Sequence, residues 1–295
     1  MRATDAASVI ADAATAGEGS VGVEAASAAH PELLVKLCGM RTEADVAGAV
    51  AAGCDFIGFV VEVPGKRRSV SRAQLAALTA TLPEGVRAVG VFVDEPVEAV
   101  HRLLAEGIID AAQLHGSEDD IYIARLRQLL AEDGAGEAEP PSAMPSASAT
   151  TQPSQPASPA RSAPSPAAPA RSAPTAPGSN TRPDPRSARI IQAFRIRGHD
   201  DIAAAAASAA DLVLLDSGAG SGKPFDWQLL EGFPRPFLLA GGLGPDNLAQ
   251  AITQAQRAAG ENLVGVDMSS GIETDNVKDP LKMKAATVAA KGANR

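Results

Sequence analysis

Eight short apolar runs constrain the fold of this chain more than any other feature. Each run is rich in Val, Ile, Leu or Ala and lacks the alternation of apolar and polar residues that marks a strand with one face in water. Such runs are typical of strands buried on both faces, as in a parallel sheet. We expect strands at residues 34–39, 56–61, 87–93, 111–115, 190–196, 212–216, 236–242 and 263–269.

Segments with helical spacing separate these runs. Examples are residues 42–53, 71–82 and 245–260, and Pro245 stands where the first turn of a helix favours proline. Eight strands that each lead into a helix match the number and order of elements in an α/β fold of the closed (β/α)8 type, the TIM barrel. A doubly wound open sheet has the same alternation, so the count of elements leaves both architectures open.

Residues 131–188 interrupt the alternation between the fourth helix and the fifth strand. They hold 13 of the 22 prolines of the chain, mixed with Ala, Ser and Arg, and contain no apolar run that could form a core. Because this composition cannot offset the entropy lost on ordering, we expect a disordered insertion, which a barrel would carry on the face opposite its active site. We interpret residues 1–32 as a flexible lead-in and residues 33–295 as a single barrel domain with this insertion.

Composition narrows the range of partners. The formal net charge is -9 and the basic residues are scattered, which predicts neither a nucleic acid nor a membrane surface as partner. No apolar run approaches the roughly 18 residues of a membrane span. The two cysteines are too few for a disulfide framework and lack the paired spacing of a zinc site. We therefore expect a cytoplasmic protein that binds a small molecule.

Two of the apolar runs end in an ionisable residue. LVKLCG ends with Cys38 and Gly39, and LVLLDS places Asp216 at the end of its strand. Each has an ordinary explanation, because free cysteine is often a buried hydrophobe and aspartate often caps a turn. In a barrel, however, both strand ends belong to the rim that carries the chemistry. The pair predicts a thiol and a carboxylic acid at one barrel mouth, whereas Cys54 begins its strand and lies at the opposite face.

Glycine-rich and polar stretches follow other strands. AGGLG at 240–244 and MSSGIE at 268–273 close the seventh and eighth strands, where barrels often bind phosphate through exposed backbone N–H groups. The glycines of GSGKPFDW at 220–227 predict a flap over the mouth. Further candidates at the rim are Arg68 in the basic run KRR, Gln113 and His115 at the end of the fourth strand, and Asp267 in the eighth; a histidine there is as often structural as functional.

Seven motifs in this order resemble the phosphoribosylanthranilate isomerase family: KLCGM, PGKRRSVS, QLHG, LLDSG, FDW, AGGL with PDN, and VDMSSGIE. The resemblance runs from about Leu34 to Ala290, apart from the insertion. It implies a TIM barrel and a step of tryptophan biosynthesis, the Amadori rearrangement of N-(5'-phosphoribosyl)anthranilate to 1-(2-carboxyphenylamino)-1-deoxyribulose 5-phosphate. It implies no cofactor and no metal, and a monomer or a homodimer.

The resemblance also implies roles for individual residues. Cys38 matches the general base, Asp216 the general acid, and Arg68 the arginine that meets the anthranilate carboxylate, with Arg67 as a rival for that contact. Further substrate contacts are implied for Gln113, His115 and Asp267. The phosphate site that it implies consists of Gly241, Gly242, Ser269, Ser270 and Gly271.

Two alternatives stay open. The first is the sister isomerase of histidine synthesis, or a dual-substrate version of it; those enzymes have an aspartate where this chain has Cys38. The second is a catalytically silent phosphate-ligand binding protein that acts through the Pro-rich segment. The presence of both Cys38 and Asp216 favours an enzyme.

Overall fold

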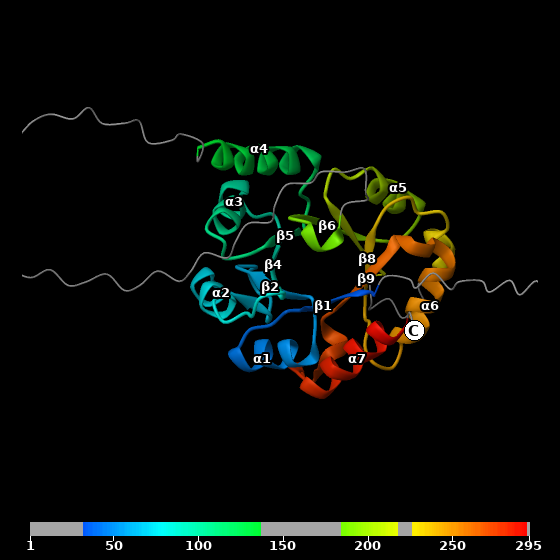
Figure 1. Cartoon of the computed structure of the whole chain (residues 1–295). Helices are drawn as coiled ribbons and strands as arrows, with labels where there is room; N and C mark the ends of the chain where they lie inside the picture. Colours follow the sequence, from blue (N-terminus) through cyan, green and yellow to red (C-terminus); the bar gives the residue numbers. More distant parts are fainter. Residues whose placement is uncertain (1–31, 137–183, 218–225, 294–295) are drawn as a thin grey trace, which may run out of the picture.

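A closed barrel of eight parallel strands forms the centre of the protein, whose computed structural model describes residues 32–136, 184–217 and 226–293 (Figure 1). Each strand pairs with its neighbours in parallel, and β1 pairs with both β9 and β2, which closes the ring. The eight predicted strands and the predicted TIM barrel are confirmed, and the open sheet is excluded. The barrel strands are β1 (Leu34–Cys38), β2 (Phe56–Val61), β4 (Arg87–Phe92), β5 (Ala111–Leu114), β6 (Ile190–Arg195), β7 (Leu212–Asp216), β8 (Phe237–Ala240) and β9 (Leu263–Met268).

Helices surround this barrel (Figure 1). In the described part of the chain, β7 is followed by the 3-10 turn η2 (Trp227–Leu230) and not by an α-helix. A two-residue strand, β3 (Ser69–Val70), pairs with the end of β2. The α-helices are α1 (Glu43–Ala52), α2 (Arg72–Thr79), α3 (Val97–Ala105), α4 (Asp120–Gly136), α5 (His199–Ala207), α6 (Leu248–Ala259) and α7 (Pro280–Gly292).

Local sequence determines where several helices begin. The Thr42 side chain accepts a hydrogen bond from the N–H of Asp45, whose carboxylate in turn accepts from the Thr42 N–H, and this capping box begins α1. Ser71 and Gln74 form the same arrangement at α2. The expectation that Pro245 opens α6 is wrong, because that helix begins three residues later, at Leu248.

Two apolar layers explain why the strands are apolar on both faces. Successive strand residues point to opposite sides, so one set fills the barrel interior and the other packs against the helices. The interior set includes Leu34, Phe56, Leu212, Leu214 and Leu238. The outer cluster is larger and includes Val35, Leu37, Ile57, Val213 and Leu239.

The predicted insertion is shorter than the sequence indicated. Residues 131–136 continue α4, and Pro185–Ser187 form the turn η1, where Arg186 makes an ion pair with Asp55 at 3.3 Å. Both ends of the segment therefore lie at the amino-terminal face of the barrel, where β6 begins. The rest of the predicted insertion, 137–183, and the predicted lead-in up to residue 31 lie outside the described residues.

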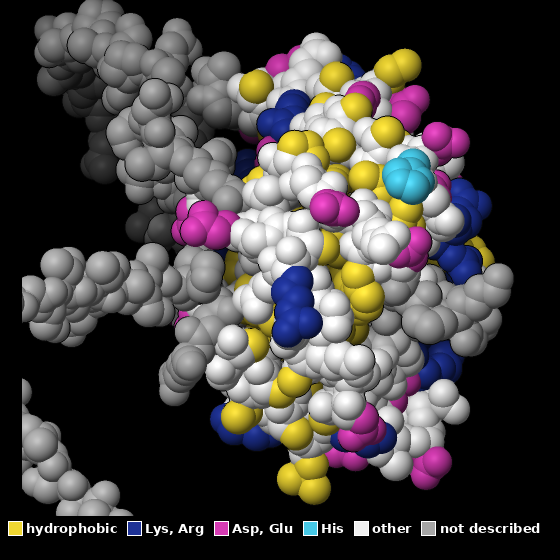
Figure 2. All heavy atoms as spheres, turned by 90° about the vertical axis from the view of Figure 1, so that its right-hand side faces the viewer, with side chains coloured by type: hydrophobic (Ala, Val, Ile, Leu, Met, Phe, Trp, Pro, Cys, Tyr) yellow, Lys and Arg dark blue, Asp and Glu magenta, His cyan; other side chains and the backbone are white. Residues whose placement is uncertain are grey.

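The distribution of charged side chains on the surface does not point to a particular partner. On the face drawn in Figure 2, basic and acidic side chains are interspersed. None of the helices within the described ranges is long and apolar enough to cross a membrane. The absence of a nucleic acid partner and the cytoplasmic location stay predictions.

Gly265 provides a test of barrel closure. It lies in β9 beside a shift in the β8–β9 register, and a Cβ there would come 2.4 Å from the Leu34 carbonyl oxygen. We expect Gly265→Ala to lower the free energy of unfolding by about 1–3 kcal/mol, since overpacking forces the backbones apart. Denaturant unfolding measures this loss. The control Gly292→Ala, whose Cβ would meet no atom within 4 Å, should lose none; an equal loss in both variants would contradict the packing argument.

Candidate active site

Cys38 and Asp216 lie at the carboxyl ends of β1 and β7, at the same mouth of the barrel. In the ring of strands, β9 and β8 stand between β1 and β7 on one side. The loops that follow β8 and β9 therefore lie between the thiol and the carboxylate. The structure thus brings together the two ionisable strand ends and both glycine-rich stretches, and Cys38 is buried while Asp216 is half-buried.

A glycine makes room beside each of the two reactive groups. Gly58 stands opposite Cys38 in the β1–β2 register, and a Cβ on it would come 2.6 Å from the Cys38 Sγ. Gly241 has a φ of 107°, in the left-handed region, and a Cβ there would come 2.8 Å from the Asp216 Oδ1. A side chain at Gly58 would displace the thiol, and one at Gly241 would displace Ser217 and the carboxylate beside it.

The loops after β8 and β9 pack backbone against backbone. A Cβ on Gly244 would come 2.7 Å from the Gly271 carbonyl oxygen, and one on Gly271 would come 2.1 Å from that of Leu243. The Ser269 hydroxyl donates to the Cys38 carbonyl oxygen at 3.2 Å, which attaches this pair of loops to β1. The predicted phosphate residues all belong to these loops: Gly241, Gly242, Ser269, Ser270 and Gly271.

Asn247 fixes the loop that holds the first glycine pair. Its Oδ1 accepts from the Gly244 N–H at 2.9 Å, and its Nδ2 donates to the Gly242 carbonyl oxygen at 3.0 Å. This asparagine is the residue before the first turn of α6, so its side chain stabilises the loop and not the helix. Pro245 was expected to open α6, but the residue that precedes this helix is Asn247, and its side chain shapes the loop.

Arg68 is held by Glu273. Its Nε donates to Oε1 at 2.7 Å and its Nη2 donates to Oε2 at 2.8 Å. Glu273 also binds the guanidinium of Arg67 and, at 2.8 Å, the Nζ of Lys278. Burial works against the charged form, yet the hydrogen bonds from Arg68, Lys278 and Arg67 hold the pKa of Glu273 well below its usual value. Glu273 is therefore a carboxylate that orients three cations.

The two arginines lie differently. The Arg68 side chain lies over Gly39, so closely that a Cβ on this glycine would come 2.6 Å from the Arg68 Cδ. Arg67 donates from Nη1 to the Asn276 carbonyl oxygen at 2.7 Å, in the small hairpin of β10 (Glu273–Thr274) and β11 (Val277–Lys278). Because Arg68 lies over Gly39, the residue that follows Cys38, it is the arginine beside the thiol.

Lys36 is the functional candidate that sequence analysis missed. Its side chain is fully buried, and its Nζ donates to the Asp267 Oδ1 at 2.7 Å. Asp267, predicted as a substrate contact, is therefore already bound within the chain through one oxygen. A signal for Lys36 was present, because a lysine inside an apolar strand, two residues before Cys38, must share the interior face with it. For Glu273 and Lys278 the sequence offered no such signal.

Burial raises the pKa of the Cys38 thiol above its usual value, and Asp267 adds to this. Lys36 acts in the opposite direction, as does Lys278. The second thiol differs: burial and the neighbouring Asp55 raise the pKa of Cys54 to about 12, although a backbone hydrogen bond and Lys291 act in the opposite direction. Cys54 thus fits the predicted role of a small buried hydrophobe, whereas Cys38 stands among cations that favour its thiolate.

Gln113 and His115 lie at the end of β5. The Nε2 of Gln113 and the Nδ1 of His115 are 3.0 Å apart, and the imidazole is exposed. Gln113 is buried, and its Oε1 has no hydrogen-bond partner among the described residues. Of the flap predicted at 220–227, residues up to 225 lie outside the described part of the chain, and Trp227 packs against the outer core.

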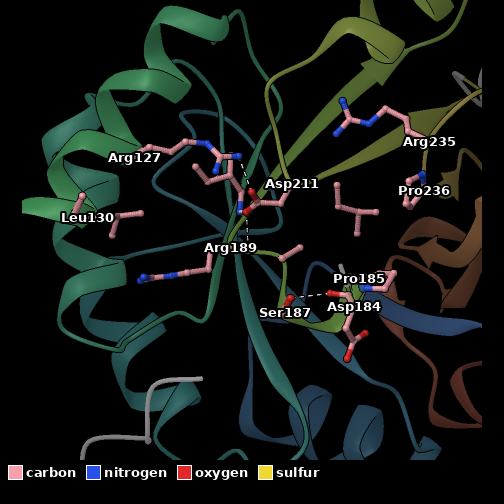
Figure 3. A pocket seen from close by; sticks show the side chains of 13 residues that line it. Arg127, Leu130, Asp184, Pro185, Ser187, Arg189, Asp211, Arg235 and Pro236 are labelled. Atoms are coloured by element: carbon pink, nitrogen blue, oxygen red, sulfur yellow. Dashed lines mark hydrogen bonds and ion pairs between the residues drawn. The ribbon is translucent and has the colours of Figure 1, made fainter. Parts of the chain in front are cut away.

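A hollow of about 630 Å³ lies at the other end of the barrel, near the starts of β6, β7 and β8 (Figure 3). Figure 3 shows Arg127 directed at Asp211, and the two side chains form an ion pair of 2.5 Å. The guanidinium of Arg235 binds the carbonyl oxygens of Ser208 and Ala210. These arginines are thus used within the fold. Within the described ranges, no three His, Cys, Asp or Glu side chains are grouped as a metal site requires.

A closed (β/α)8 barrel with a thiol and a carboxylate at the mouth, beside two glycine-rich loops, defines the class of (β/α)8-barrel enzymes. The family model described as N-(5'phosphoribosyl)anthranilate (PRA) isomerase matches residues 35–132 and 183–288. The chain belongs to this family.

Individual proteins agree with this assignment. An N-(5'-phosphoribosyl)anthranilate isomerase of Symbiobacterium thermophilum is 33% identical over 266 residues, which cover 88% of this chain and 99% of that protein. The phosphoribosylanthranilate isomerase structure from Thermotoga maritima is 25% identical, with a TM-score of 0.60, and covers 88% and 99% of the two chains. Another such isomerase, in complex with reduced 1-(o-carboxyphenylamino)-1-deoxyribulose 5-phosphate, has the same fold at 24% identity and a TM-score of 0.59, with the same coverage.

Glu273 makes the stability of the mouth depend on pH. Because its pKa in the folded protein is lowered, its contribution is present above the pKa of an unfolded glutamate, about 4.3, and is lost as the pH falls below that value. We expect Glu273→Gln to be less stable than the parent at pH 7, with a difference that shrinks as the pH falls from 5 to 3. Urea unfolding at each pH measures it, and a constant difference would contradict the ion cluster.

Proposed function

We propose that the protein catalyses the isomerisation of N-(5'-phosphoribosyl)anthranilate to 1-(2-carboxyphenylamino)-1-deoxyribulose 5-phosphate. The observation that carries this proposal is the position of Cys38 and Asp216 at one barrel mouth, with the loops of β8 and β9 between them. A reaction that needs an acid and a base at two sites on one phosphorylated sugar fits this arrangement. Membership of the isomerase family supports the same reaction.

Asp216 serves as the general acid. It gives its proton to the ring oxygen of the ribose, the bond between this oxygen and C1' breaks, and the nitrogen lone pair forms the Schiff base. A carboxylic acid at hydrogen-bonding distance is a common donor for such a step. The glycine at position 241 leaves the carboxylate the room to reach the substrate.

Cys38 serves as the general base. Its thiolate takes the proton from C2' of the Schiff base, and the electrons of that bond return to the nitrogen, which gives an enolamine. Tautomerisation then yields the ketone. One proton leaves Asp216 and one arrives at Cys38, so the step is balanced and the electrons stay within the substrate. The base must be the thiolate, because the neutral thiol has little basicity.

Arg68 binds the carboxylate of the anthranilate ring. Its Nε and Nη2 are used by Glu273, which holds the guanidinium plane, and its Nη1, which binds none of the described residues, is the group we assign to the substrate. Arg67 is the weaker rival, because its Nη1 already donates to the Asn276 carbonyl oxygen.

The remaining contacts follow from position. The backbone N–H groups of Gly241, Gly242 and Ser269–Gly271 bind the 5'-phosphate. Gln113 offers its buried Oε1 to a substrate hydroxyl, with His115 beside it. Asp267 keeps its second oxygen for the substrate, since Lys36 binds the first. A monomer or a homodimer remains the expected assembly.

Substitution of the two reactive residues tests the assignment. We expect Cys38→Ala and Asp216→Asn each to lower kcat by about a hundredfold or more, the low end for loss of a general acid or base, with substrate still bound. The measurement is the decrease of substrate fluorescence, with binding followed separately. Cys54→Ala and Asp184→Asn remove the same groups at the amino-terminal face of the barrel, before β2 and β6, and should keep full activity. Normal turnover by either active-site variant would overturn its role.

A further inference from the structure

We propose that Lys36 is a positioning residue for catalysis: its buried ammonium group, held by Asp267, stabilises the thiolate of Cys38. The inference rests on the proposed function of Cys38 as the base. It adds a group that acts through the base and decides how much of the base is ready to react.

The geometry places the ammonium beside the thiol. Lys36 and Cys38 are two residues apart on β1, so both point into the barrel. Both approach the space left by Gly58: a Cβ on this glycine would come 3.0 Å from the Lys36 Nζ and 2.6 Å from the Cys38 Sγ. The nitrogen and the sulfur therefore share one small space that has no side chain of its own.

Asp267 holds the ammonium in this place. Lys36 stands directly opposite Asp267 in the β1–β9 register, and their ion pair measures 2.7 Å. Burial alone would lower the pKa of Lys36, but the carboxylate and the neighbouring Cys38 outweigh it, and the result is a raised pKa. The charged form of Lys36 is therefore favoured at this site.

Structure alone gives little reason for this pair. A buried ion pair is often no more stabilising than apolar residues of similar volume, because both charges lose their water. Much of the barrel interior is apolar, with Leu34, Leu214 and Leu238 among its residues, and Gln113, which is also buried there, carries no charge. A charge kept in such surroundings, next to a proposed base, is better explained by its effect on that base.

Two further cations near Cys38 belong to the ion cluster of Glu273. Lys278 on β11 and Arg68 before β3 both bind Glu273, which offsets their charges. Asp267 on β9 disfavours the thiolate. Among the groups that lower the pKa of Cys38, Lys36 has the largest effect. Removal of the Lys36 charge should therefore raise the pKa of the Cys38 thiol more than removal of any exposed cation.

Titration of the thiol tests the proposal directly. In a Cys54→Ala background, Cys38 is the one thiol of the chain, and the ultraviolet absorbance of its thiolate gives the midpoint. We expect Lys36→Met to raise this midpoint by about one pH unit or more. At a pH below the midpoint, the fraction of Cys38 present as thiolate would then fall about tenfold. Asp267→Asn should lower the midpoint, because it removes the opposing charge. Lys284→Met, an exposed lysine on α7, is the control and should leave it unchanged.

Opposite shifts in the two variants separate an electrostatic role from a structural one. An unchanged or lowered midpoint in Lys36→Met would overturn the proposal, and so would a midpoint that does not fall in Asp267→Asn. If Lys36→Met fails to fold, Lys36→Gln takes its place with the same expected rise, and an unchanged midpoint in that variant would overturn the proposal. The ascending limb of kcat/KM against pH should move with the midpoint in each variant. The titration needs no substrate, so an absence of turnover by the parent would refute the proposed function without altering this result.

Discussion

The register of β1 between its two neighbours is the constraint on which the rest of the site depends. It places Lys36 opposite Asp267 on one side and Cys38 opposite Gly58 on the other. A slip of one residue would turn both side chains toward the helices. Closure of the barrel excludes such a slip, because β1 must pair in register with β2 and with β9 at the same time. The same closure gathers the carboxyl ends of all eight strands into one mouth.

Two groups of charges surround the thiol, and each is held by a carboxylate. Asp267 binds Lys36 inside the barrel, and Glu273 binds Arg68, Arg67 and Lys278 at the rim. Because the rim cations are tied down, Arg68 can present a fixed guanidinium to an anionic substrate. Because Lys36 is tied down beside Gly58, its charge acts at short range on Cys38. Side-chain positions at the mouth are thus set by ion pairs, and the space for them is set by glycines.

Much of the fold could be predicted from the sequence, because buried parallel strands leave a clear pattern of consecutive apolar residues. The thiol and the carboxylate could also be placed, since each ends such a run. Glu273 and Lys278 could not, because they meet Arg68 only through a hairpin and a loop that are far from it along the chain. Lys36 could have been found from its two-residue spacing to Cys38. The insertion was expected to begin at residue 131, but α4 continues to Gly136, because Ala131 and Glu132 are good helix formers. Asn247, and not Pro245, precedes α6 because its side chain bridges Gly242 and Gly244, a contact that no local pattern shows.

The central claim is that this mouth, with a thiol where the histidine-pathway isomerases have an aspartate, acts on the anthranilate derivative. The direct measurement is turnover of the purified protein on N-(5'-phosphoribosyl)anthranilate and, in parallel, on the aminoaldose of the histidine pathway, with both products identified. We predict conversion of the first substrate to 1-(2-carboxyphenylamino)-1-deoxyribulose 5-phosphate at a kcat within the usual range for enzymes, about 1–1,000 per second. Turnover of the aminoaldose alone, or of neither substrate, would contradict the account.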